Sequence, residues 1–235
     1  MIYEYCIQEV IRKQAEEFYK GFPKILDLDL NQQLKADYVR MEDFRRKDSF
    51  LDFCESLYQQ IELITSNICK HSELNKIVKR QWSFPAFTKN IYSTKDKDKR
   101  YEKGDSIAKL ICHSDKPVNL DENKNISELS ATNKMYIVTY FIGYGGALCN
   151  KDSKAYNELI DLLYYIYIIR CRTHRDTSRQ TDNQKNIFDS VMQQQGIFYF
   201  KFLGALAQYV ELIKNGWDNF TNTIQALNAV AEKPQ

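Results

Sequence analysis

The sequence contains little glycine and proline, with 8 Gly and 4 Pro in 235 residues. These two residue types form many of the turns between short strands, so their scarcity argues against sandwiches, barrels and solenoids. At 43% hydrophobic and 27% charged residues, the chain is too apolar to be disordered. It is also long enough to bury a substantial core. The composition therefore predicts a globular protein built of long helices.

Several common catalytic signatures are absent. The sequence has no GxxxxGK[ST], GxGxxG, GxSxG or HExxH motif, which argues against nucleotide hydrolysis, dinucleotide binding, serine hydrolysis and zinc proteolysis. Its 3 His lie far apart and its 6 Cys form no CxxC pair, so we expect no metal site and no cofactor. The cysteines instead suggest reduced core residues of a cytoplasmic protein.

Charge is nearly balanced, with 33 Lys and Arg against 31 Asp and Glu. A nucleic-acid site would therefore have to come from local clustering of basic residues. The N-terminal residues do not resemble a signal peptide, and no uncharged apolar run reaches about 18 residues. We expect neither secretion nor contact with a membrane.

Apolar residues recur at helical spacing in three stretches. The first two predict a helix that Gly21 and Pro23 stop and a helix that begins at an N-cap, Asp48. The third predicts one long helix that ends near Gly216. The members of the three stripes are, in order, Tyr3, Cys6, Val10, Gln14 and Phe18; Phe50, Phe53, Cys54, Leu57, Ile61, Ile64 and Ile68; and Phe188, Val191, Met192, Gln195, Tyr199, Phe202, Leu206, Tyr209, Val210 and Ile213.

Residues 155–170 are apolar almost all round, which predicts a central helix enclosed by its neighbours. Residues 133–148 fit either a strand or a buried helix ending at the glycines, and their surroundings favour the helix. Two charged stretches, 93–104 and 114–124, fit solvated loops. We therefore predict an all-α helical bundle, a single domain over residues 1–235 with a polar, charged central insertion at about 93–132.

A basic cluster follows the apolar run of the central helix: Arg170, Arg172, His174, Arg175 and Arg179. Arg170 continues the inward face of the helix, and His174 follows four residues later on the same face. A guanidinium that points inward costs several kcal/mol unless an anion meets it. We therefore expect a buried carboxylate, for which Glu62 is a candidate, or a bound phosphate beside Arg170.

Two interpretations fit this cluster. Metal-free RNA cleavage needs a group that exchanges protons near neutral pH and a fixed positive charge for the phosphorane, which His174 and Arg170 would supply. Arg172, Arg175 and Arg179 would then bind neighbouring phosphates of the substrate. Alternatively, basic residues near a helix C-terminus offset the negative end of the macrodipole and have no further role.

Two segments resemble the HEPN superfamily of small all-helical proteins, many of which are ribonuclease toxins or abortive-infection effectors in bacteria. Residues 50–62 are similar to the family's early helix with an inward polar residue, here Glu62. Residues 166–175 are similar to the helix end that carries the family's Arg…His motif. The family spaces its Arg and His further apart than the three residues found here, and one residue fewer rotates His174 by about 100°.

The resemblance implies a metal-independent endoribonuclease of toxin or antiviral defence type, which cleaves RNA by attack of the 2′-hydroxyl with Arg170 and His174 as catalytic residues. It also implies a homodimer in which both copies of these residues face one cleft, and an antitoxin or defence-system partner protein. The alternative is a non-catalytic helical interaction module that binds a partner protein or RNA and has the same helices.

Overall fold

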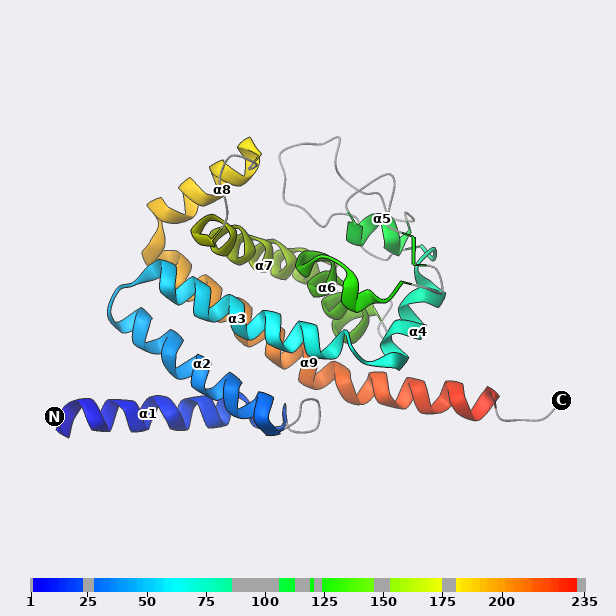
Figure 1. Cartoon of the computed structure of the whole chain (residues 1–235), viewed down its shortest axis with the longest axis horizontal. Coiled ribbons are helices and arrows are strands. Elements are labelled where there is room, and N and C mark those ends of the chain that lie inside the picture. Colours follow the sequence, from blue (N-terminus) through cyan, green and yellow to red (C-terminus); the bar gives the residue numbers. More distant parts are fainter. Residues whose placement is uncertain are drawn as a thin grey trace. The chain divides into compact units, whose positions relative to one another are not determined.

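The protein is all-α, as the sequence predicts (Figure 1). The computed structural model describes residues 2–22, 28–85, 106–112, 119–120, 124–145, 153–174 and 181–231. Within these ranges there is no strand, only an isolated bridge between Pro85 and Ser106. The elements are α1 (Ile2–Phe18), α2 (Leu28–Arg46), α3 (Phe50–Ile68), α4 (Ser72–Gln81), α5 (Ile107–Cys112), the 3₁₀ turn η3 (Ile126–Glu128), α6 (Ala131–Val138), the π-helix η4 (Thr139–Gly145), α7 (Ser153–His174), α8 (Asp182–Gln193) and α9 (Gln195–Ala231).

The described helices group into two compact units. The first comprises Met1–Ile64 and Leu162–Val210, and the second comprises Thr65–Asp161 and Glu211–Gln235. The single-domain organisation stays a prediction. Of the two charged stretches, 93–104 lies outside the described residues, and only 119, 120 and 124 of the second are described. Between them, α5 is not polar, because Ile107, Ala108, Leu110 and Ile111 are buried.

The stripe predicted for the second helix is confirmed in α3. Its seven apolar members are each at most 3% exposed. The predicted N-cap is wrong, because Asp48 has a φ of 56° and closes α2 instead. The Asp48 and Ser49 N–H groups donate to the carbonyl oxygens of Arg45 and Phe44, at 3.2 and 2.9 Å. This Schellman-type closure satisfies carbonyls at the end of α2, so α3 starts after Ser49.

The face predicted for α1 is wrong, although its end before Gly21 is confirmed. Tyr3 and Val10 are 77% and 55% exposed, whereas Ile11 and Ala15 are 4% and 1% exposed. The buried row continues at the same spacing to Tyr19, whose hydroxyl donates to Gln60 Oε1 at 2.7 Å. This buried hydrogen bond ties the chain just beyond α1 to Gln60 of α3, while α1 itself lies beside α2 in Figure 1.

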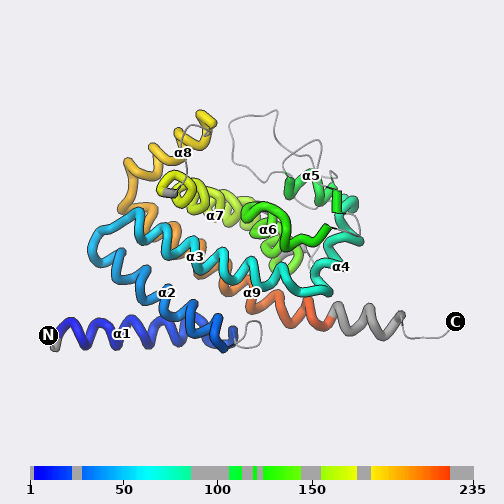
Figure 2. The backbone as a smooth tube through the Cα atoms, viewed as in Figure 1, coloured from blue at the N-terminus to red at the C-terminus, as the bar shows by residue number. Residues whose placement is uncertain are grey.

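The prediction of one helix from Phe188 that ends near Gly216 is wrong in two respects: the helix is broken in two, and its second part does not end at Gly216. The chain turns at Gln194 (φ −127°, ψ 34°), so that α8 and α9 are separate helices (Figure 2). The Gln194 N–H donates to the Val191 carbonyl at 3.0 Å, and the Gln194 carbonyl accepts from Ile197 at 2.9 Å. The break is thus capped on both sides without Gly or Pro. At the other end, α9 continues through Gly216 to Ala231.

Gly216 serves close packing in the second unit. A Cβ at this position would overlap the carbonyl oxygen of Ile142, which belongs to η4. Similarly, a Cβ at Gly143 of η4 would overlap the side chain of Leu212. The prediction that residues 133–148 are helical is confirmed for the described part, since α6 and η4 together extend to Gly145.

The central helix is enclosed as predicted. No residue of α7 from 159 to 172 is exposed, and Leu159, Leu163 and Ile166 have no exposed surface. This burial is expected for a helix that carries apolar side chains on nearly all sides.

Two carboxylates of α2 are buried beside arginines of the same helix. Asp37 Oδ1 accepts from Arg40 at 2.8 Å, and Glu42 Oε2 accepts two bonds from Arg45 at 2.9 and 2.7 Å. Burial raises the pKa of Asp37, and the nearby Arg40 guanidinium opposes this shift only partly. The ionised form of Asp37 therefore weakens the fold.

We expect Gly216→Ala to lower the free energy of unfolding by about 1–3 kcal/mol, because the added methyl group collides with backbone rather than with a movable side chain. Gly196→Ala is the matched control, since a Cβ at Gly196 meets nothing within 4 Å. Urea denaturation of both variants measures the difference. Equal stability of the two variants would contradict the close approach of η4 and α9.

We expect Asp37→Asn to stabilise the protein at neutral pH. The folded-state pKa of Asp37 lies above its ordinary value of 3.8, so the folded state binds the proton more tightly and the wild type loses stability as the pH rises. The advantage of the variant should grow between about pH 3 and about pH 7, and thermal melting across this range measures it. A variant advantage that is largest in acid would show the opposite sign.

Candidate functional site

The predicted site residues gather at the C-terminal end of α7, in the first unit. Arg170 and Arg172 lie in its last turns, and the helix ends at His174. The Thr173 hydroxyl donates to the Arg170 carbonyl at 2.8 Å. Arg175, Arg179 and the side chain of His174 lie outside the described residues. The described part of the site is therefore centred on Arg170.

Arg170 packs on an aromatic ring and pairs with no acid among the described residues. Its guanidinium carbon lies 5.2 Å from the centroid of the Tyr58 ring. Its Nε atom is buried and has no hydrogen-bond partner in the part of the chain that the structure describes. A cation over an aromatic face gains about 0.5–1 kcal/mol at exposed sites and more where water is excluded. This gain offsets only part of the cost of burying the charge.

Glu62 reaches Arg170 only through Tyr58. The Tyr58 hydroxyl donates to Glu62 Oε1 at 3.5 Å, a long and weak hydrogen bond. Burial raises the pKa of Tyr58, the Glu62 carboxylate raises it further, and Arg170 opposes both. The phenol therefore stays protonated and can donate at neutral pH. The expected direct contact between Glu62 and Arg170 is thus not found among the described residues, and each of the two contacts Tyr58 instead.

Further tyrosines extend from Tyr58 along α7. The Tyr58 and Tyr167 rings are 6.0 Å apart, and the Tyr167 and Tyr164 rings are stacked at 6.4 Å. The Tyr164 hydroxyl accepts from Gln184 Nε2 of α8 at 3.4 Å. Burial raises the pKa of Tyr164, and this hydrogen bond partly opposes the shift. The half-buried rings of Tyr164 and Tyr167 thus contribute to packing within the first unit.

Arg172 points to a different neighbour. Its guanidinium carbon lies 4.3 Å from the centroid of the Phe188 ring of α8. Residues two apart on a helix are separated by about 200°, so Arg172 and Arg170 project from opposite sides of α7. The structure therefore does not bring these two arginines to a common point.

Sequence reasoning missed Tyr58. Its position was readable in principle, because Tyr58 lies four residues before Glu62 on α3 and therefore shares its face. No group of three or more His, Cys, Asp or Glu that could hold a metal ion occurs among the described residues.

No family model, curated protein or solved structure matches the chain. The resemblance to the HEPN superfamily therefore stays a prediction. By length and composition alone, one helix of the described chain could cross a membrane: residues Gln195–Asn222 of α9, which contain an 18-residue window with a mean hydropathy of 1.2. Of the apolar window in this segment, 44% is buried inside the protein.

We expect Arg170→Met to leave the free energy of unfolding within about 1 kcal/mol of wild type, because no acid in the described part of the chain pairs with Arg170. Arg45→Met is the matched comparison. It should cost about 2 kcal/mol or more, because it leaves Glu42, whose side chain is 7% exposed, without two hydrogen bonds. Urea denaturation measures both. A larger loss for Arg170→Met would identify Arg170 as a structural residue.

Proposed function

We propose that the protein is a cytoplasmic, metal-independent endoribonuclease of bacterial defence or toxin type. One observation carries the proposal: a half-buried arginine at the end of the enclosed helix has a buried Nε and no ion pair among the described residues. A charge of this kind costs stability unless an anion binds it. An RNA phosphate supplies that anion.

The reaction needs two groups at this helix end. His174 takes the proton from the 2′-hydroxyl as its oxygen attacks the adjacent phosphorus, and a proton is returned to the departing 5′-oxygen. Arg170 stabilises the extra negative charge of the phosphorane. The products are a 2′,3′-cyclic phosphate and a free 5′-hydroxyl. Tyr58 and Glu62 position the Arg170 guanidinium, since Tyr58 contacts both residues.

The remaining predicted partners belong to the same proposal. Arg175 and Arg179 bind phosphates that flank the cleaved bond, and Arg172 contributes to the positive potential from the α8 side of the helix. The active unit is a homodimer, and an antitoxin or another defence-system protein controls it.

Purified protein should cleave labelled single-stranded RNA in the presence of EDTA and leave 2′,3′-cyclic phosphate ends. We expect His174→Ala and Arg170→Met each to lower the rate at least about 100-fold, since each removes a group used in the transition state. Arg12→Met is the control, because Arg12 is an exposed arginine of α1 that pairs with Glu9. Its rate should match that of wild type.

Two outcomes contradict the proposal. RNA that is bound and remains intact would favour the interaction module that the sequence also permits. Cleavage that persists in both variants would place the reaction elsewhere in the chain or in a contaminant.

A further inference from the structure

Positive charge is concentrated in the part of the second unit that runs from residue 65 to residue 134. This stretch carries 14 Lys and Arg against 9 Asp and Glu, whereas the rest of the chain carries 19 against 22. A local excess of this kind produces a positive potential although the total charge of the chain is close to zero. The stretch therefore has the clustering of basic residues that a nucleic-acid site requires.

The helix α4 carries part of this excess on its outer face. Leu74 and Val78 of this helix are buried, whereas Lys76 and Arg80 are exposed. The two exposed cations are four residues apart, so they lie on one face of the helix with their Cβ atoms about 5–6 Å apart. Two positive charges are thus held in a row along the surface of α4.

These two cations are available to a ligand. Arg80 forms no ion pair with any residue that the structure describes, unlike Arg40 and Arg45 of α2, which each pair with an acid. Lys76 Nζ lies 2.7 Å from Glu73 Oε1, but 71% of the Lys76 side chain is exposed. Exposed ion pairs contribute little to stability, so Lys76 can exchange this carboxylate for a phosphate.

An exposed aromatic ring follows α4. Phe84 is 52% exposed, although hydrogen bonds hold its backbone on both sides. Its N–H donates to the Gln81 carbonyl at 2.9 Å, and its carbonyl accepts from the Ile107 N–H of α5 at 2.8 Å. The ring therefore projects into solvent from a fixed backbone, which reduces the conformational entropy lost when a ligand packs against it.

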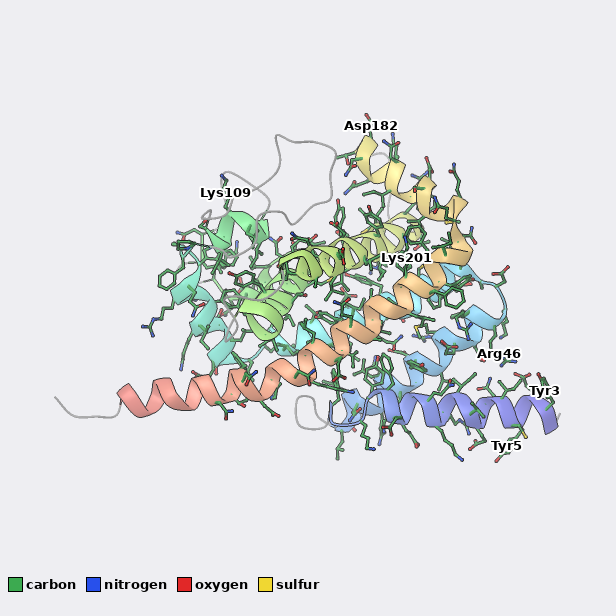
Figure 3. The ribbon with its side chains drawn as sticks, turned by 180° about the vertical axis from the view of Figure 1, so that it is seen from behind. Tyr3, Tyr5, Arg46, Lys109, Asp182 and Lys201 are labelled. Atoms are coloured by element: carbon green, nitrogen blue, oxygen red, sulfur yellow. The ribbon has the colours of Figure 1, made fainter. Side chains whose placement is uncertain are left out.

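The helix α5 brings a third cation to the same place. The Ala108 N–H donates to the Trp82 carbonyl at 2.8 Å, so α5 begins against the end of α4. Lys109 is the next residue of α5, and Figure 3 shows it pointing away from the helices of this unit. Arg80 and Lys109 thus both lie close to Phe84, where the end of α4 meets the start of α5.

We propose that this α4–α5 surface, comprising Lys76, Arg80, Phe84 and Lys109, binds single-stranded RNA. The three cations contact phosphates, and the Phe84 ring stacks on an unpaired base. None of the four residues takes part in the proposed cleavage reaction. The surface therefore holds RNA in the second unit, whereas the proposed reaction uses Arg170 and His174 of the first.

The aromatic ring favours a single strand over other anions. An acidic peptide would match the cations but has no planar base to stack on Phe84. A helix that binds a membrane surface inserts an apolar face into the lipid, whereas Leu74 and Val78 of α4 are already buried in the protein. In double-stranded RNA the bases stack on one another, so the ring would have no free base to contact.

The number of contacts predicts weak binding that depends strongly on salt. For single strands, each phosphate contact contributes about −0.7 to the slope of the logarithm of the binding constant against the logarithm of the salt concentration. Three contacts therefore predict a slope of about −2. The inference does not depend on the ribonuclease proposal, because binding can be measured with an RNA that the proposed reaction cannot cleave.

Fluorescence anisotropy of a labelled 2′-O-methyl-uridine decamer tests the charges. This probe has no free 2′-hydroxyl, and the parent chain carries Arg170→Met to weaken binding at the proposed cleavage site. Arg80→Met should lower the affinity at least about 3-fold and reduce the salt slope by about 0.7. Arg12→Met is the matched control, because Arg12 is an exposed arginine of α1. It should bind like the parent.

Variants of Phe84 separate base stacking from apolar contact. Phe84→Leu keeps an apolar side chain but has no planar face, so it should lower the affinity at least about 5-fold. Phe84→Trp should bind at least as tightly as the parent. Phe200→Leu is the matched control, because Phe200 of α9 is 74% exposed, and it should bind like the parent. Thermal melting of each variant verifies that the fold is intact.

Four results would overturn the proposal. The parent could fail to bind the decamer, or Arg80→Met and Phe84→Leu could bind it like the parent. A double-stranded competitor that displaces the decamer as well as a single strand does would exclude stacking. Arg80-dependent binding to phosphatidylserine vesicles, without binding to the decamer, would assign the surface to a membrane. Each of these results leaves the cleavage reaction untouched, so the two proposals can fail separately.

Discussion

The enclosure of α7 is the constraint on which the rest of the site depends. Between residues 159 and 172 this helix has no fully exposed position, so every charge it carries there is at least partly covered by the protein. Arg170 continues the face of Leu159, Leu163 and Ile166, so its guanidinium is carried against Tyr58 of α3. The position of the charge thus follows from the apolar pattern that buries the helix.

Tyr58 contacts both the half-buried guanidinium of Arg170 and the carboxylate of Glu62. Its ring supplies a face that attracts a cation, and its hydroxyl points to Glu62, so the carboxylate remains one side chain away from the guanidinium. A direct ion pair would have satisfied Arg170 internally. The Tyr58 ring stabilises Arg170 only in part, and under the proposed function an RNA phosphate would supply the missing anion.

The sequence predicts those features that a single periodic pattern specifies. The stripe of α3 and the enclosure of α7 are confirmed because each has one apolar pattern and no competing one. In α1 two apolar rows compete, and the row that is buried continues into Tyr19, whose hydrogen-bond partner Gln60 lies far away in the chain. The apolar spacing continues across Gln194, so it does not reveal the break between α8 and α9. The inward direction of Arg170 is predictable from helix geometry, whereas its contact with Tyr58 depends on how α3 packs against α7.

Gly216 illustrates a related ambiguity, since a glycine late in a helical pattern can mark a helix end or a close approach, and here it is the second. The missing side chain of Gly216 also restricts the register of α9 against η4. One turn away in either direction, the same face presents Leu212 and Phe220, which are too large to lie against the Ile142 carbonyl. A slide by one turn would therefore bring a large side chain against this carbonyl, so Gly216, together with Gly143 of η4 against Leu212, limits the axial position of α9 in the second unit.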